Sequence, residues 1–167
     1  MQSYAYAMPE AAPSRRVLRF NTIDDALAEA MRLAAAERDG RLAQVGNWPL
    51  GQTLGHLATW ANFAFDGYPP SVCPPMPIRM IFRLFRNRVI KKGMSPGINI
   101  RGVPGGTLGT EPLPTELALN QFQDAMERLR QTAPARPNPL FGPLTHDQWI
   151  QLNLRHAELH LGFLVPK

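Results

Sequence analysis

The segment from Tyr68 to Pro114 constrains the fold of this chain more than any other feature of its sequence. It holds nine of the 17 prolines, with Pro-Gly and Gly-Gly turns, and it separates two pairs of amphipathic helical patterns. A short link joins the helices within each pair, whereas so long a crossover lets the second and third helices run parallel. Strand signals are nearly absent and no internal repeat is found, so we predict an all-α four-helix bundle.

Capping and turn signals set the ends of the predicted helices. Asn21-Thr22 opens the first helix, which should stop at Asp39-Gly40, and the second runs from about Pro49 to Gly67. The third runs from Pro114 to about Gln131, and the capping box Thr145-His146-Asp147-Gln148 starts a last helix that continues to about Val165. An extra basic amphipathic helix, Pro77 to Lys92, is predicted inside the crossover. Residues predicted to face inward in the four bundle helices include Ile23, Leu27, Ala30, Met31, Ala34, Leu50, Leu54, Leu57, Ala61, Ala64, Leu117, Phe122, Ala125, Met126, Leu129 and Trp149. The apolar face of the crossover helix carries Ile78, Ile81, Phe82, Phe85 and Val89.

Length and composition indicate one domain. A chain of 167 residues with 44% hydrophobic content can bury a normal core, so we predict a domain over residues 15–167 after a flexible tail of residues 1–14. The single cysteine, Cys73, excludes an internal disulfide and a CxxC zinc or redox pair, which leaves only nitrogen and oxygen ligands for a metal. The sequence shows neither a signal peptide nor a membrane span, and we expect a cytoplasmic location.

Three of the four histidines form the candidate metal site. His156 and His160 are four residues apart in a helical stretch, so both imidazoles leave one face of the helix and can converge on one ion. His56, about a hundred residues earlier in the second helix, can supply a third ligand. Three imidazoles suit Zn²⁺ or Ni²⁺ and leave a coordination position for water or a thiol. The alternative is three partly buried histidines that are satisfied by protein partners.

The histidines belong to a wider pattern. It consists of Gln52-x-x-x-His56, His156-x-x-x-His160, the segment from Gly46-Asn47-Trp48 to Ala58, Phe141-Gly142-Pro143-Leu144-Thr145, Trp149 and His160-Leu161-Gly162-Phe163-Leu164. From Arg15 to Pro166 the chain resembles the DinB/YfiT-like superfamily of metalloenzymes, and within it the uncharacterised domain-of-unknown-function family 1569 branch.

The resemblance implies an up-down-down-up bundle with a divalent metal on His56, His156 and His160 that faces an open pocket. Some members of the superfamily are thiol-dependent transferases or isomerases, so the resemblance points to a transferase- or hydrolase-like enzyme on a small molecule or a low-molecular-weight thiol. Asn153 and Leu159 stand where histidine is common in the branch. These two departures spare the expected ligands.

Other residues near the histidines admit two interpretations. Gln52, Asn153 and Trp60 each lie about one turn from a histidine and are predicted to orient a ligand or touch a substrate, or else to cap, bridge or pack helices. Glu158 lies about 200° around the helix from His156, which excludes a zincin motif and predicts that its carboxylate faces solvent.

The net charge of +5 comes from the crossover, which has seven bases and no acid between Asp66 and Glu111. Its helix is interpreted in three ways: a solvated arginine face, a clamp in which Arg79, Arg83 or Arg86 binds a substrate carboxylate, or a contact with an anionic membrane or nucleic acid. The third has the least support from sequence, and no nucleic-acid partner is expected. The alternative function is therefore a non-catalytic interaction protein whose crossover contacts an anionic partner. A homodimer stays open.

Overall fold

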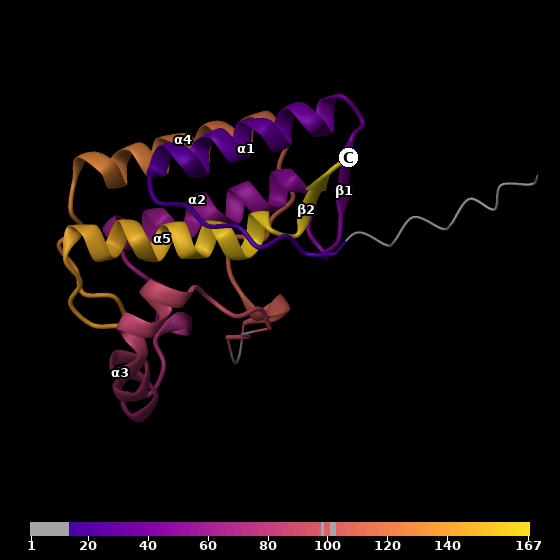
Figure 1. Cartoon of the computed structure of the whole chain (residues 1–167). Helices are drawn as coiled ribbons and strands as arrows, with labels where there is room; N and C mark the ends of the chain where they lie inside the picture. The colour runs from indigo at the N-terminus through magenta and orange to yellow at the C-terminus, as the bar shows by residue number, and fades with distance from the viewer. Residues whose placement is uncertain (1–13, 98, 101–102) are drawn as a thin grey trace, which may run out of the picture.

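The computed structural model describes residues 14–97, 99–100 and 103–167. In this part the chain is mostly helical, which confirms the all-α prediction (Figure 1). The predicted tail lies outside the described residues, except for residue 14. The elements are α1 (Ile23–Arg38), β1 (Leu42–Gln44), α2 (Leu50–Asp66), the 3₁₀ turn η1 (Pro70–Val72), α3 (Met76–Lys92), the 3₁₀ turn η2 (Pro104–Gly106), α4 (Thr115–Gln131), α5 (His146–Leu161) and β2 (Leu164–Pro166).

Two capping boxes start the helices at the predicted places. The Thr22 hydroxyl accepts from the Asp25 N–H while the Asp25 side chain accepts from the Thr22 N–H, and Thr145 and Gln148 repeat the arrangement at α5. Each box satisfies backbone donors that would otherwise lack partners. α1 ends before Gly40, whose positive φ of 66° lets the chain turn away at the predicted position.

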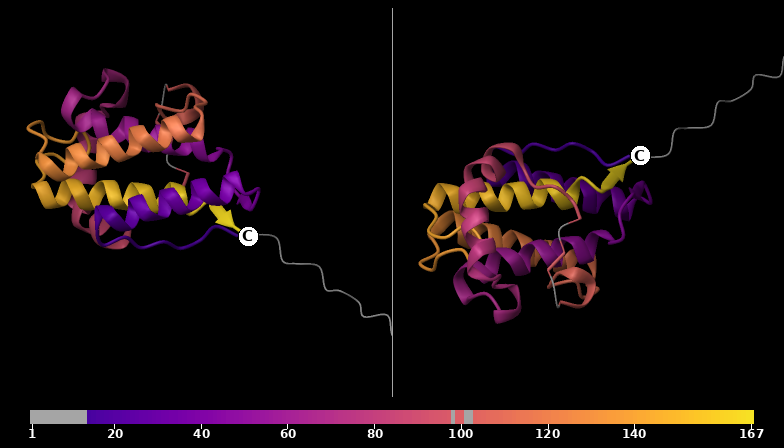
Figure 2. Two further views of the ribbon diagram at one scale, coloured as in Figure 1. Left: turned by 90° about the horizontal axis from the view of Figure 1, so that it is seen from above. Right: turned by 90° about the horizontal axis from the view of Figure 1, so that it is seen from below.

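The main core lies between α1, α2, α4 and α5 (Figures 1 and 2). Two residues predicted to be inside it, Met31 and Leu117, are each 47% exposed. The buried stripe of α1 is centred on Ala26, Ala30 and Leu33, so Met31 projects about 120° away from its centre. On α4 a similar shift of the stripe leaves Leu117 outside.

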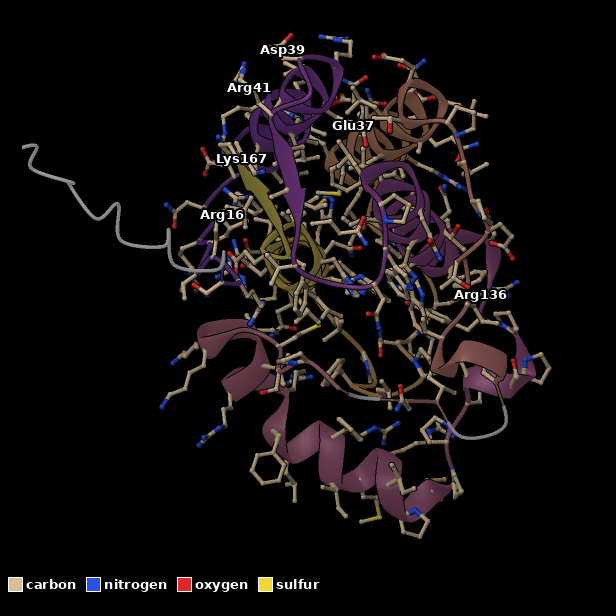
Figure 3. All side chains as sticks on the ribbon, turned by 90° about the vertical axis from the view of Figure 1, so that its right-hand side faces the viewer. Arg16, Glu37, Asp39, Arg41, Arg136 and Lys167 are labelled. Carbon is tan, nitrogen blue, oxygen red and sulfur yellow. The ribbon has the colours of Figure 1, made fainter. Side chains whose placement is uncertain are left out.

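The last helix is shorter than predicted. α5 ends at Leu161, and β2 then pairs with β1 in an antiparallel ladder in which Leu42 faces Pro166 and Gln44 faces Leu164 (Figure 1). The ladder supplies backbone partners that a continuing helix would have supplied, and three residues per strand are too few for an alternating pattern. Arg16 extends this edge, because its N–H donates to the Gly162 carbonyl (2.8 Å) and its Nε to the Leu164 carbonyl (2.7 Å; Figure 3).

The crossover helix forms where it was predicted, but most of its apolar face is not covered by another element. Only Phe82 and Val89 of the predicted apolar face pack against the smaller core around Trp149, whereas Ile78, Ile81 and Phe85 are exposed. α3 stands at the margin of the molecule, apart from α1 and α4 (Figures 1 and 3). None of the described helices combines the length and the apolar character needed to cross a bilayer.

Candidate metal centre

α2 and α5 bring the three predicted histidines together. The Nε2 atoms of His56 and His156 are 3.2 Å apart, and the candidate ligand atoms of all three rings lie within 4.8 Å of one another. The predicted convergence of His56 with the pair on α5 is therefore confirmed. His146, the fourth histidine, is separate, and its Nε2 hydrogen-bonds the Leu129 carbonyl at 2.6 Å.

A backbone carbonyl of the crossover orients His56. Nδ1 of His56 lies 2.7 Å from the Leu108 carbonyl oxygen, which also accepts from Trp60 Nε1 at 3.1 Å. Because a carbonyl only accepts, the neutral imidazole carries its proton on Nδ1, and Nε2 presents its lone pair to the other histidines. An outer partner of this kind fixes the ring of a metal-binding histidine.

Two glycines of α2 allow the crossover to lie close to the helix. A Cβ at Gly51 would meet the Leu113 carbonyl oxygen at 2.1 Å, and one at Gly55 would meet a Leu113 side-chain carbon at 2.7 Å. In the same stretch, Gln52 Nε2 donates to the Thr110 carbonyl at 2.7 Å. Gln52 thus holds the segment that orients His56. Its effect on the histidines is therefore indirect, through the crossover backbone.

Two tryptophans line the cluster. Trp48, in the loop before α2, stacks on His160 with ring centroids 5.3 Å apart and an interplanar angle of 8°. Trp60 lies against His56 and His156, at 5.9 and 6.0 Å between centroids. Both tryptophan rings therefore pack against imidazoles of the cluster.

Burial keeps all three imidazoles neutral. It lowers the pKa of His56 to about 4, although the hydrogen bond to Leu108 acts in the opposite direction. It lowers the pKa of His160 to about 3, with a further contribution from His56 and Arg15, and it lowers the pKa of His156 well below the ordinary value, helped by the other two rings. Neutral imidazole is the form that binds a metal, so the nitrogens are ready as ligands at neutral pH.

The spacing fits a metal. Two imidazole nitrogens on one tetrahedral zinc lie about 3.3 Å apart, because each Zn–N bond is about 2.0–2.1 Å long. The 3.2 Å between the Nε2 atoms of His56 and His156 matches this value, and the ligand atom of His160 lies within 4.8 Å of those of the other two. Three nitrogen ligands leave room for a fourth ligand that is not protein.

The remaining predicted residues have partners other than the three histidines. Asn153 is buried, and its Nδ2 donates to the Trp149 carbonyl one turn earlier (3.0 Å), a contact within α5. Arg83 lies against Gly142, and Arg86 donates to the Pro143 carbonyl at 2.9 Å, so both contact the loop before α5. The clamp on a substrate carboxylate remains a prediction.

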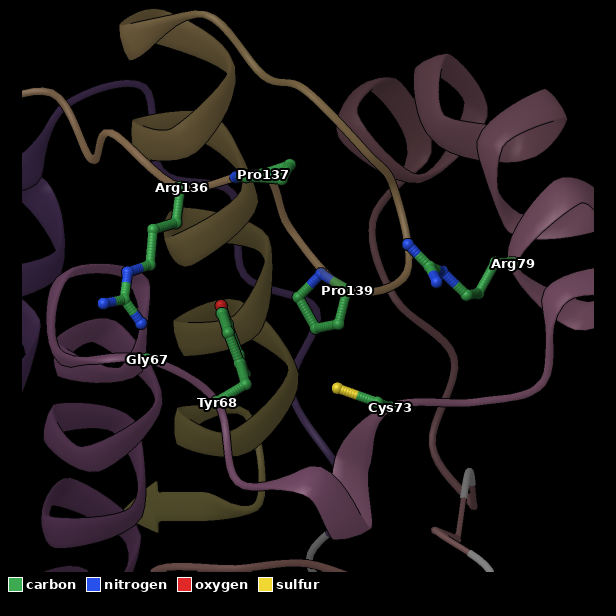
Figure 4. A pocket seen from close by; sticks show the side chains of 7 residues that line it. All are labelled: Gly67, Tyr68, Cys73, Arg79, Arg136, Pro137 and Pro139. Carbon is green, nitrogen blue, oxygen red and sulfur yellow. The ribbon is translucent and has the colours of Figure 1, made fainter.

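Arg79 lies in a different place, at a surface cavity of about 270 Å³ (Figure 4). Its lining is Gly67, Tyr68, Cys73, Arg79, Arg136, Pro137 and Pro139. The Tyr68 hydroxyl accepts from Asn138 at 3.4 Å, and burial raises the pKa of Tyr68. Tyr68 packs on Trp60 with centroids 6.2 Å apart, so this cavity and the histidine cluster share one aromatic wall.

Glu158 corrects the sequence analysis. It was predicted to face solvent, but it is buried, because the segment before α1 runs along this side of α5. Its Oε1 accepts from the Phe20 N–H at 2.6 Å and lies 3.1 Å from Arg155 Nη2, while Arg19 lies 3.7 Å from Oε2. Burial raises the pKa of Glu158. The carboxylate points to Phe20 and not to the cluster, which agrees with the exclusion of a zincin arrangement.

Sequence reasoning missed the Leu108 carbonyl, since a backbone acceptor leaves no trace in residue type. It also missed the buried Arg155–Glu158 pair. A signal was present for the crossover contact, because two glycines four residues apart in a helix indicate a close approach of backbone.

Fold and site together define a class: a small helical protein with a cluster of one buried and two half-buried histidines between two helices, whose nitrogens are close enough to hold one metal ion. Residues 12–167 match the family described as "Protein of unknown function (DUF1569)", and the chain belongs to that family. No curated protein and no solved structure matches the chain.

Proposed function

We propose that this protein binds one divalent metal through His56, His156 and His160 and uses it in a reaction on a small molecule. The observation that carries the proposal is the convergence of three neutral imidazoles, with the His56 lone pair turned inward by the Leu108 carbonyl. Zn²⁺ and Ni²⁺ are the ions that suit an all-imidazole set best in this proposal. When bound, such an ion would lower the pKa of a water or thiol at its open position.

The DinB-like placement is part of the same proposal. It is supported by the directions of the helices, since α1 and α5 run one way and α2 and α4 the other (Figure 1). It is also supported by the origin of the ligands, one from α2 and two from α5. The proposal includes the thiol-dependent transferase- or hydrolase-like activity that this placement implies, and separately a cytoplasmic location.

The chain's own residues would act in three ways. Leu108 and Trp60 hold the His56 ring, Trp48 covers the His160 ring, and Gln52 fixes the crossover segment over α2. These contacts pre-organise the ligands, and a metal site needs ligands that are held in the productive geometry.

Elemental analysis of protein purified without an affinity tag tests the proposal. We expect close to one equivalent of a divalent metal in the natural chain and almost none in His156→Ala. His146→Gln is the matched control, because it changes a histidine of the same helix that lies outside the cluster. Metal absent from the natural chain after incubation with Zn²⁺ or Ni²⁺, or retained by His156→Ala, would contradict the proposal.

A further inference from the structure

The outer face of α3 is the largest group of exposed apolar side chains in the described part of the chain. The described part of the chain has ten exposed large hydrophobic residues, and six of these ten lie on α3. They are Met76, Ile78, Met80, Ile81, Leu84 and Phe85, and Leu84 is 83% exposed. Apolar side chains gathered in this way usually mark a surface that contacts a partner.

The helix is nevertheless held firmly on its inner side. Phe82 packs edge-on against Phe141 with ring centroids 6.0 Å apart, and Arg86 donates to the Pro143 carbonyl. Near the other end, Arg19 donates to the Lys91 carbonyl at 2.9 Å. The outer face is therefore displayed by a docked helix at the margin of the fold (Figure 3).

The basic side chains on the outer side of α3 gather near its C-terminal end. At about 100° per residue, Arg88, Lys91 and Lys92 project to the same side as Leu84. The outer face is thus apolar over its first turns, from Met76 to Phe85, and basic over its last turns. α3 has six bases and no acid.

We propose that α3 is an in-plane anchor that binds an anionic phospholipid surface. Its apolar turns would enter the boundary between headgroups and acyl chains, and its basic end would lie among the anionic headgroups. A helix with exposed apolar side chains and clustered Lys and Arg has the composition of such an anchor. Anionic lipid complements Arg88, Lys91 and Lys92 on the outer side, because each Lys or Arg near the surface strengthens binding.

Other occupants fit this face less well. A second copy of the chain would bring its own Arg88, Lys91 and Lys92 to this face, and like charges at close range repel. A nucleic acid would pair with the bases alone and would leave Leu84 and its apolar neighbours without contacts, since its affinity comes mainly from phosphates. Sequence alone placed Ile78, Ile81 and Phe85 on one apolar face of the helix, and the exposure of these three side chains is what favours the membrane.

Co-sedimentation of the full chain with vesicles tests this proposal. One set contains phosphatidylcholine only, and the other contains phosphatidylcholine with about one third phosphatidylglycerol. We expect binding to the anionic set alone, weakened by salt. Leu84→Gln should weaken it by about ten-fold through lost apolar burial, and Lys91→Gln by about five-fold through lost charge.

Leu117→Gln on α4 and Arg38→Gln on α1 are the matched controls, since they alter an exposed apolar and an exposed basic residue elsewhere, and neither should change binding. Leu84 is so exposed that its variant should keep the melting temperature of the natural chain. The proposal is overturned if the chain does not bind the anionic vesicles, or if the control variants lose as much vesicle binding as Leu84→Gln and Lys91→Gln. It is also overturned by a dimer that depends on Leu84 without vesicle binding, or by binding to duplex DNA that exceeds binding to vesicles. The metal content of Leu84→Gln should stay unchanged, which separates this test from that of the histidine cluster.

Discussion

Each of the three imidazoles is kept neutral by its surroundings, and this has a consequence for stability. In the unfolded chain a histidine titrates near its ordinary pKa of 6.5, whereas in the folded chain burial lowers the pKa of His56 to about 4 and that of His160 to about 3. Between these values the unfolded state binds more protons than the folded state. Stability of the metal-free protein therefore falls as the pH decreases through this window.

We predict that metal-free protein loses on the order of 2–3 kcal/mol of unfolding free energy between about pH 6.5 and pH 4 for each such histidine that stays neutral. Denaturant unfolding at a series of pH values, with a chelator present, measures the loss. The variant His160→Gln should have a shallower dependence, because one of the titrating groups is gone. A slope that is unchanged in His160→Gln would show that other groups control it.

The buried pair of Arg155 and Glu158 predicts a second effect at single residues. Glu158→Ala removes the acceptor of the Phe20 N–H and leaves the buried Arg155 guanidinium without its carboxylate. Removing one partner of a buried ion pair costs about 3–5 kcal/mol, and we expect a loss of that size in chemical denaturation. Glu116→Ala, which breaks the exposed pair with Arg38, should cost less than about 1 kcal/mol. Equal costs for the two variants would contradict the assigned burial of Glu158.

At the scale of elements, α2 and the end of the crossover form one unit. We predict that Gly51→Ala destabilises the protein by about 2–3 kcal/mol, because the new Cβ would meet a backbone oxygen at 2.1 Å and the segment would have to move. Gly55→Ala should be nearly neutral, because the Leu113 side-chain end can rotate away and alanine favours a helix by about 1 kcal/mol. Thermal unfolding of both variants measures the difference, and a reversed order would mean that the crossover is not packed as described.

The same unit explains what the sequence could and could not predict. Capping residues and periodicity are local signals, and they predict α1, α2, α4 and the start of α5. The convergence of His56 with His156 and His160 follows from the inward-facing sides of the two helices that carry them. The strands β1 and β2 were not predicted, because each is stabilised by a partner more than a hundred residues away. The exposed face of α3 was not predicted either, since periodicity identifies an apolar face without showing whether another element covers it.

For the whole molecule, metal binding should appear as stability. A ligand at about 100 times its Kd that binds only the folded state adds about 2.7 kcal/mol, or about 5–10 °C in Tm for a chain of this size. We predict that added Zn²⁺ or Ni²⁺ raises the Tm of the natural chain by such an amount, and that a chelator reverses it. His156→Ala should fold, because the core between the helices does not need the ion. Neither the metal nor the chelator should change the Tm of this variant. Identical responses of the two proteins would mean that the ion binds elsewhere.

His56 and His156 are 100 residues apart in the chain. At a synthesis rate of about 5–20 residues per second, a ribosome needs roughly 5–20 seconds to travel from one to the other. During that interval α3 and α4 are synthesised, but His56 still lacks its two histidine partners, because both lie on α5. Uptake of the proposed metal would therefore be delayed until α5 has emerged and docked, so that metal loading of a newly made chain would report the completion of its folding.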